Sequence, residues 1–310
     1  MCLYHFVCTT TGYIKNEWVL SVFENGKYGV QMFFVISGFV IPLSMYNGNY
    51  TLKKIPTFLF KRLSRLEPPY IFSILLVLGI LFLRHQLGMS NDHQSLSFKQ
   101  IGAHFMYLVP FFADIKWLNQ VYWTLAIEFQ YYFLMIFMYI LVTSNKLVLR
   151  ILSYLLFLTG GLVHSNEFLP HWLPVFLLGI ALFLRHVNKI SSTEFFCLII
   201  PTITMLFINY SLPSVIFVLT ALAAIIFYTD LKVPLANLIG KASYSIYLIH
   251  PVIGASLINL LSHTYNETYQ KPLVITLGLI VTLLFSWLMY IFVEKPSINW
   301  STSFKYKDAK

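Results

Sequence analysis

Long apolar runs, separated by short polar segments, make up most of the sequence. A transmembrane helix needs about 20 predominantly apolar residues, and the pattern predicts an all-α, polytopic membrane helix bundle of about ten transmembrane helices. The chain opens on roughly 12 apolar residues, too few to cross a bilayer, so we expect the first span to be truncated and to begin before residue 1. The other predicted spans are residues 28–46, 70–84, 121–142, 147–164, 170–185, 194–209, 213–229, 243–262 and 272–293.

Two longer polar segments interrupt this pattern. Residues 13–27 carry charges of both signs, and we interpret them as a loop. Residues 85–120 contain an apolar patch at 105–112 that is too short to cross, which predicts a non-cytoplasmic loop with an interfacial or re-entrant piece. Pro68 and Pro69 are expected near the start of the third span, because proline is favoured in the first turn of a helix. The expected organisation is one membrane domain over residues 1–300 and a short basic tail over 301–310.

The composition excludes a separate soluble domain, because 58% of the residues are hydrophobic and 11% are charged. The formal net charge of +9 would suggest nucleic acid in a soluble protein, but here most cations flank apolar spans. Orientation against the bilayer and its lipids explains them better, and no nucleic-acid partner is predicted. Cys2, Cys8 and Cys197 lie in apolar surroundings without metal-like spacing, so we predict neither a metal site nor a disulfide.

The distribution of lysine and arginine predicts how the chain is oriented. With residues 53–65 on the cytoplasmic side, fifteen of the 21 basic residues face the cytoplasm, in agreement with the positive-inside bias. Both termini are then cytoplasmic, in a multi-pass protein of the plasma membrane. The cytoplasmic set is Lys53, Lys54, Lys61, Arg62, Arg65, Lys146, Arg150, Arg185, Lys189, Lys232, Lys241, Lys295, Lys305, Lys307 and Lys310; the outer set is Lys15, Lys27, Arg84, Lys99, Lys116 and Lys271.

The densest basic cluster lies in the stretch that leads into the third span, FLFKRLSRLEPPY. Arg62 and Arg65 are three residues apart, so on a helix they share a face. Two neighbouring guanidinium groups can bind phosphate oxygens through paired hydrogen bonds. The alternative is a topology anchor that pairs with lipid headgroups.

His5 and Glu128 are ionisable residues that fall inside predicted spans. His5 lies about seven residues before the outer end of the first span, and Glu128 about seven residues after the outer start of the fourth, so both lie roughly 10 Å below the outer surface. If they meet, the carboxylate would orient the imidazole as a general base. The alternative for His5 is a ring satisfied by a neighbouring helix, although ionisable groups inside membranes usually serve function. Ser37 and Gly38 are small residues that favour close helix packing.

Five motifs in order resemble the acyltransferase 3 family of integral-membrane O-acyltransferases, and the match covers nearly the whole chain. GVQMFFVISGFV is similar to the family's second helix, FLFKRLSRLEPPY to its paired-arginine motif and WTLAIEFQYYF to its W-S-L-x-x-E-x-x-F-Y stretch. ASYSIYLIHPV resembles the S-Y-x-x-Y-L-x-H element, and VEKP the C-terminal E-x-P. The basic residue and the Asp-Gly-Arg-like opening that usually precede the first-helix histidine lie outside this chain.

The resemblance assigns roles to residues. His5 falls on the family's catalytic histidine, with Glu128 as its orienting carboxylate, and Arg62 and Arg65 fall on the arginines thought to hold acyl-coenzyme A. Ser37 and Gly38 would line the path of this donor. His250, Trp123 and Tyr247 would line the substrate channel, although His250 could instead only satisfy a helix contact.

The resemblance also implies the substrates. Acetyl-coenzyme A or another acyl-coenzyme A would be the donor, with no permanently bound cofactor, and the acceptor would be a hydroxyl of a surface glycan or a lipid-linked saccharide. The expected location is then a bacterial inner membrane. Two alternatives stay open: a transporter or flippase for a glycan precursor, because polar residues in a bundle also mark substrate pathways, and an inactive truncated copy. A transporter usually contains an internal repeat, and none is obvious by eye.

Overall fold

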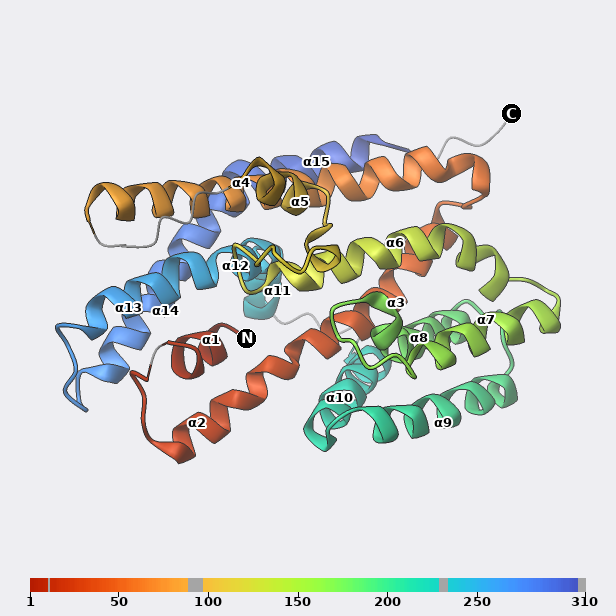
Figure 1. Ribbon diagram of the computed structural model, residues 1–310. Coiled ribbons are helices and arrows are strands. Elements are labelled where there is room, and N and C mark those ends of the chain that lie inside the picture. Colours follow the sequence, from red (N-terminus) through yellow and green to blue (C-terminus); the bar gives the residue numbers. More distant parts are fainter. Residues whose placement is uncertain (11, 89–96, 229–233, 306–310) are drawn as a thin grey trace. The chain divides into compact units, whose positions relative to one another are not determined.

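A computed structural model describes residues 1–10, 12–88, 97–228 and 234–305 (Figure 1). These residues form helices and no strand, which confirms the predicted all-α class. The α-helices are α1 Cys2–Cys8, α2 Glu17–Glu24, α3 Gly29–Asn47, α4 Ile55–Gln86, α5 Phe98–Phe105, α6 Tyr122–Val142, α7 Leu147–Gly160, α8 Leu169–His186, α9 Ser192–Asn209, α10 Leu212–Tyr228, α11 Pro234–Lys241, α12 Ser243–Ile249, α13 Ser256–Ser262, α14 Lys271–Met289 and α15 Lys295–Ser303. Short 3-10 or π-helical turns are η1 Asn25–Tyr28, η2 Leu52–Lys54, η3 Val109–Phe111, η4 His250–Ala255 and η5 Tyr290–Glu294.

Seven helical segments of the described chain are long and apolar enough to cross a membrane, by length and composition. This confirms a polytopic protein. The prediction of about ten spans also counted α1, α7 and α10, which are shorter than all seven of these segments, the shortest of which have 18 residues. The seven segments are Glu17–Asn47, Leu52–Gln86, Tyr122–Val142, Leu169–His186, Ser192–Asn209, Ser243–Ser262 and Lys271–Ser303.

Two predicted boundaries are wrong. Residues 13–27 are not a loop throughout, because helix starts at Glu17, where the Asn16 side chain accepts a hydrogen bond from the Val19 backbone N–H at 3.1 Å. Such an N-cap satisfies a free donor of the first turn, so the charges of this segment lie on a helix. The third span does not start after Pro68 and Pro69 either: α4 starts at Ile55 and contains both prolines. Transmembrane helices tolerate interior prolines, so the basic cluster belongs to the helix itself.

Other predictions on the polar segments have mixed outcomes. In the segment 85–120, α5 and η3 are short, so its described part contains no crossing helix. Asp92 and His93 lie outside the described residues. The last predicted span continues as helix through η5 and α15 to Ser303. The first three residues of the predicted tail, 301–303, are therefore helical. Residues 306–310 lie outside the described residues.

The described residues divide into two compact units. Unit 1 comprises Met1–Lys27, Phe60–Trp123 and Lys232–Phe304, and unit 2 comprises Tyr28–Leu59, Thr124–Leu231 and Lys305–Lys310. The single domain over 1–300 stays a prediction.

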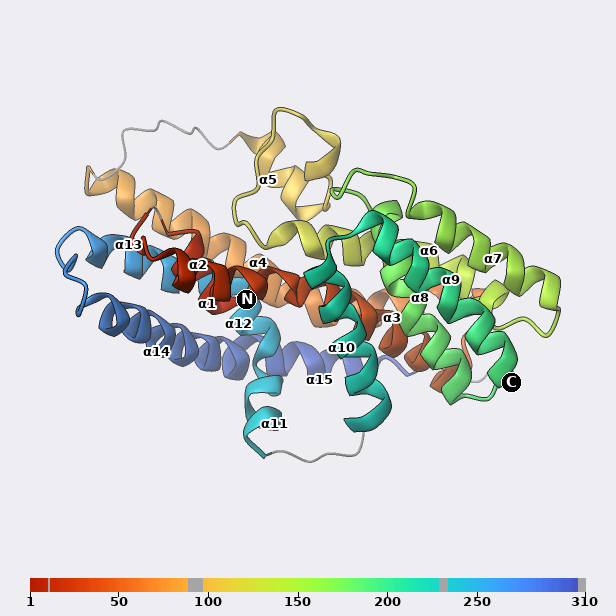
Figure 2. The same cartoon turned by 90° about the horizontal axis from the view of Figure 1, so that it is seen from below.

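In unit 1, α1 packs against η4 and α14. Phe6 is fully buried in a cluster with Tyr13 and Ile258. A Cβ atom at Gly254 would overlap the Phe6 ring and the Thr282 side chain, so this close approach requires glycine. Figure 2 shows α14 running alongside α13 in this unit. The tight packing places His5, the residue before Phe6, beside η4.

In unit 2, α3 and α8 pack closely through glycines. A Cβ at Gly38 would overlap the Phe176 backbone, and a Cβ at Gly179 would overlap the Val35 carbonyl. Small residues of this kind let helix backbones approach in membrane proteins. The rings of Phe34 and Phe176 stack beside this contact, with centroids 4.9 Å apart.

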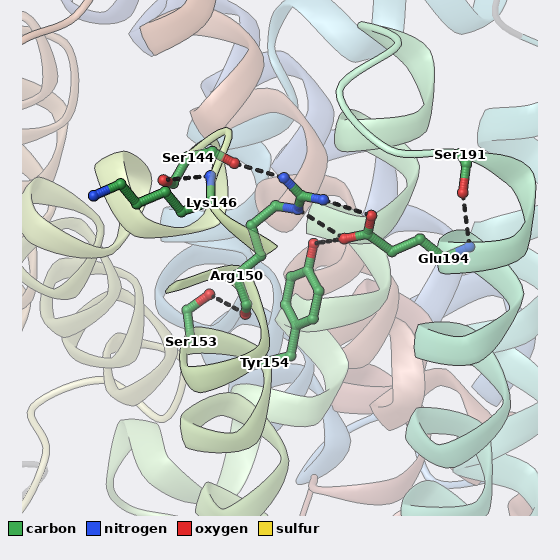
Figure 3. Close-up of polar contacts among 7 residues, drawn as sticks. All are labelled: Ser144, Lys146, Arg150, Ser153, Tyr154, Ser191 and Glu194. Atoms are coloured by element: carbon green, nitrogen blue, oxygen red, sulfur yellow. Dashed lines mark hydrogen bonds and ion pairs between the residues drawn. The ribbon is translucent and has the colours of Figure 1, made fainter. Parts of the chain in front are cut away.

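A second feature of unit 2 is a largely buried ion pair between α7 and α9 (Figure 3). Arg150 donates from Nε to Glu194 Oε1 at 2.8 Å and from Nη2 to Oε2 at 2.7 Å. Its Nη1 donates to the Ser144 carbonyl at 2.7 Å, and the Tyr154 hydroxyl donates to Glu194 at 3.1 Å. The two side chains are only 11% and 17% exposed, so each charge depends on the other.

We expect Glu194→Gln and Arg150→Met each to lower the free energy of unfolding by about 2 to 4 kcal/mol, because each leaves a largely buried charge unpaired. The double variant Arg150→Met/Glu194→Leu should recover part of this loss, since it removes both charges. Reversible unfolding in detergent micelles measures the free energy of unfolding of the wild type, the two single variants and the double variant. Asp114→Asn is the control: it breaks the exposed pair with Lys99 (side chains 67% and 51% exposed) and should cost less than about 1 kcal/mol. Single variants as stable as the control would contradict the prediction.

Candidate functional site

His5 lies on α1, and its ring is held between α1 and η4. The residue is 7% exposed, and Phe6 beside it is anchored in the core of unit 1. Its Nδ1 atom is buried and has no hydrogen-bond partner among the described residues. The ring also interacts with the Gln120 side chain.

His250 is fully buried at the start of the π-helical turn η4. Its Nδ1 lies 3.0 Å from the Ile246 carbonyl and 2.9 Å from the Tyr247 carbonyl. The next residue is Pro251, which has no N–H and so leaves a carbonyl of the preceding turn available to the ring. Because carbonyl oxygens only accept hydrogen bonds, Nδ1 carries the proton and Nε2 carries a lone pair. That Nε2 atom is buried without a partner among the described residues.

The two histidine rings are neighbours. Their centroids lie 5.0 Å apart and their planes are inclined by 58°. The Tyr247 ring lies 6.1 Å from that of His250, and its hydroxyl donates to the Val121 carbonyl at 2.8 Å. Trp123, two residues further on, is half-buried. Unit 1 therefore brings together the predicted base His5 and two of the predicted channel residues, at a π-helical turn of the type that frequently marks functional sites.

The predicted donor site lies on α4. Arg62 is buried and Arg65 is exposed, so the two guanidinium groups have different surroundings although they share one helix. Arg65 interacts electrostatically with Glu294, whose carboxylate accepts hydrogen bonds from the Ser245 backbone N–H at 3.0 Å and from its hydroxyl at 2.6 Å. This arrangement joins the paired-arginine, S-Y-x-x-Y-L-x-H and E-x-P motifs in one unit.

A family model described as an acyltransferase domain matches residues 2–291 of the chain. The chain belongs to the acyltransferase 3 family. No curated protein and no solved structure matches it. Together with the apolar helices, the family assigns the protein as a membrane acyltransferase.

The remaining predicted site residues of this acyltransferase lie in unit 2. Glu128 is buried on α6, and its carboxylate accepts a hydrogen bond from the Tyr132 hydroxyl. Since His5 belongs to unit 1, their pairing stays a prediction. Ser37 and Gly38 are buried on α3, where Gly38 lies against the Phe176 backbone. Their place along the donor path also stays a prediction.

A third buried histidine holds the polar segment of the acyltransferase in place. His104 Nδ1 donates to the Gln100 carbonyl at 2.8 Å, and its Nε2 accepts the Leu118 backbone N–H at 2.9 Å. Burial lowers the pKa of His104 below its ordinary value. The stability from this neutral ring is therefore present above the ordinary histidine pKa and is lost as the pH falls. These bonds fix the chain just before Asn119 and Gln120, the residues that reach the histidine pair.

Sequence reasoning missed Asn119 and Gln120. Asn119 Nδ2 donates to the Leu248 carbonyl at 2.9 Å, two residues before His250, and Gln120 contacts the His5 ring. Both lie a few residues before the W-S-L-x-x-E-x-x-F-Y stretch, and that position is the available signal. The Ser245–Glu294 bond was also missed, because it joins two motifs that are far apart in the sequence.

Proposed function

We propose that this membrane acyltransferase moves an acyl group, expected to be acetyl, from acyl-coenzyme A on the cytoplasmic side to a hydroxyl of a surface glycan or lipid-linked saccharide. The observation that carries the proposal is the pair of buried, partly unsatisfied histidine rings at the π-helical turn. A neutral imidazole inside a membrane bundle is suited to proton transfer.

In this mechanism His5 is the general base. As the acceptor oxygen attacks the thioester carbonyl, the hydroxyl proton moves to a ring nitrogen of His5. A carbon–oxygen bond forms, the carbon–sulfur bond breaks, and the coenzyme A thiolate leaves and takes up the proton. The products are an ester and a free thiol, so the step needs no further reactant. Glu128 would support the imidazolium if the two residues meet.

Arg62 and Arg65 would bind the phosphates of coenzyme A at the cytoplasmic mouth. Paired, charge-assisted hydrogen bonds of arginine suit phosphate oxygens, and the exposed Arg65 is accessible for such binding. Arg65 also interacts electrostatically with Glu294. The pantetheine arm would then thread between helices, past Ser37 and Gly38. The orientation of the chain, with both termini cytoplasmic, rests on the positive-inside bias.

The test incubates membranes that contain the protein with radiolabelled acetyl-coenzyme A and a mixture of lipid-linked or polymeric saccharides. The expected result is label in a base-labile ester that depends on the protein. A transporter would form no labelled ester, and an inactive copy would bind neither donor nor acceptor productively. His263→Gln, at an exposed histidine after α13, is the matched control and should retain full transfer. Absence of protein-dependent ester over a broad set of acceptors would overturn the proposal.

A further inference from the structure

The histidine pair leaves two complementary atoms without partners among the described residues. Nδ1 of His5 and Nε2 of His250 are both buried, and they belong to rings whose centroids are 5.0 Å apart. A buried polar atom without a partner is unfavourable, and in a natural protein each such atom calls for an explanation. One hydrogen bond between the two rings would satisfy both atoms.

The direction of such a bond follows from the surroundings of His250. Its Nδ1 proton points to the carbonyls of Ile246 and Tyr247, so its Nε2 atom accepts and does not donate. A bond between the rings therefore requires the proton of His5 to be on Nδ1. A neutral histidine carries one ring proton, so Nε2 of His5 would then be the unprotonated nitrogen.

The surroundings of His5 agree with this assignment. Its Nδ1 atom is buried without a partner among the described residues, as a nitrogen that faces the buried His250 ring would be. The buried Nδ1 nitrogen is suited to orientation and Nε2 to proton transfer, because the hydrogen bond of one ring nitrogen sets the state of the other.

We propose that His250 is a positioning residue for His5: its Nε2 accepts the Nδ1–H of His5 and so holds His5 in the tautomer whose Nε2 takes the acceptor proton. This inference rests on the proposed function. It assigns to His250 the orienting role that the sequence predicts for Glu128. When His5 becomes an imidazolium, its Nδ1–H stays bonded to His250 and the charge is stabilised.

The rest of the contact is built to hold this arrangement. Gly254 lets Phe6 pack against η4, which seats α1 beside the His250 ring. The titratable groups around the pair in unit 1 are the Met1 amino group, Tyr4 and Tyr247. None of these described groups is a carboxylate, and the neutral His250 ring offers His5 a buried acceptor at Nε2.

The kinetic test measures transfer against pH for the wild type, His250→Leu, His250→Gln and Glu128→Gln. His250→Leu should lower kcat by about 10²-fold, the scale of a misplaced catalytic group, with an unchanged KM for the donor. The acid limb of its profile should move to lower pH, because an imidazolium without its acceptor forms less readily. His250→Gln supplies an amide oxygen as acceptor. It should restore much of the lost kcat and return the acid limb towards that of the wild type.

Controls separate positioning from packing. His104→Gln removes a buried histidine whose two nitrogens are both satisfied, so it should lower stability without moving the acid limb. If the acid limb of the His250→Leu profile coincides with that of the wild type, the inference is overturned. This holds whether or not Glu128→Gln shifts its own acid limb. In that case the wild-type ester would still stand as support for the proposed function.

A measurement without turnover tests the same inference if no ester forms. In protein labelled with ¹⁵N in the histidine rings, two-dimensional NMR in micelles reports which nitrogen carries the proton, and His5→Gln assigns the His5 signal. We expect a protonated Nδ1 on His5 in the wild type and a mixture of tautomers in His250→Leu. A His5 with an unprotonated Nδ1 in the wild type, or a tautomer unaffected by His250→Leu, overturns the inference.

Discussion

Replacing His5 by alanine should slow acyl transfer by about 10²- to 10⁴-fold, the usual contribution of a positioned general base, while the donor still binds. The fold should survive, because Phe6 and not His5 anchors α1 in its hydrophobic cluster. His5→Gln preserves side-chain bulk and hydrogen bonding but cannot take up a proton, so it should be nearly as slow. Initial rates of ester formation at saturating donor measure the loss.

Two comparisons make this result specific. His263→Gln changes an exposed histidine and should leave the rate unaltered, which excludes a general effect of losing an imidazole. Glu128→Gln should lose less than His5→Ala, since it removes a supporting charge and leaves the base in place. Wild-type rates in both His5 variants would remove the general-base assignment, even if the family activity were confirmed.

Replacing Arg62 and Arg65 by alanine should weaken acyl-coenzyme A binding by about 1.5 to 3 kcal/mol each, the range for hydrogen bonds that involve a charged group. This corresponds to a loss of roughly 10- to 150-fold in affinity for each variant. Lysine at either position should restore binding only in part, because an ammonium group lacks the planar fork of a guanidinium. Titration of the purified protein with a non-hydrolysable thioether analogue of acetyl-coenzyme A measures both effects.

The matched control is Lys53→Ala, which removes one positive charge from an exposed position of the same basic stretch. It should change the affinity far less than either arginine variant, since it alters the local potential without removing a phosphate-binding fork. Thermal unfolding of each variant accompanies the titration, because Arg62 is buried and its loss also affects packing. Equal affinities of the wild type and the double alanine variant would assign the arginines to orientation in the membrane instead.

Much of the fold was predictable because apolar runs long enough to cross a bilayer leave few alternatives to helix. The errors occur where one local signal is opposed by another local signal or by the surrounding helices. Charges in residues 13–27 indicated a loop, yet the Asn16 cap starts a helix there. Pro68 and Pro69 indicated a helix start, yet α4 continues through them. Propensity is a weak guide when neighbouring helices and caps satisfy the backbone.

For the site, the sequence by itself determined the residue types and their order along the chain: a membrane histidine, a paired-arginine motif, an intramembrane carboxylate and the motifs that indicated the family. Only the tertiary structure decided which of them meet. It placed His250 beside His5, fixed the tautomer of His250 through two backbone carbonyls, and joined Ser245 to Glu294 near Arg65. The physical reason is that helical periodicity predicts the face on which a side chain lies, whereas its neighbours depend on how distant helices pack, and here a glycine and a π-helical turn set that packing.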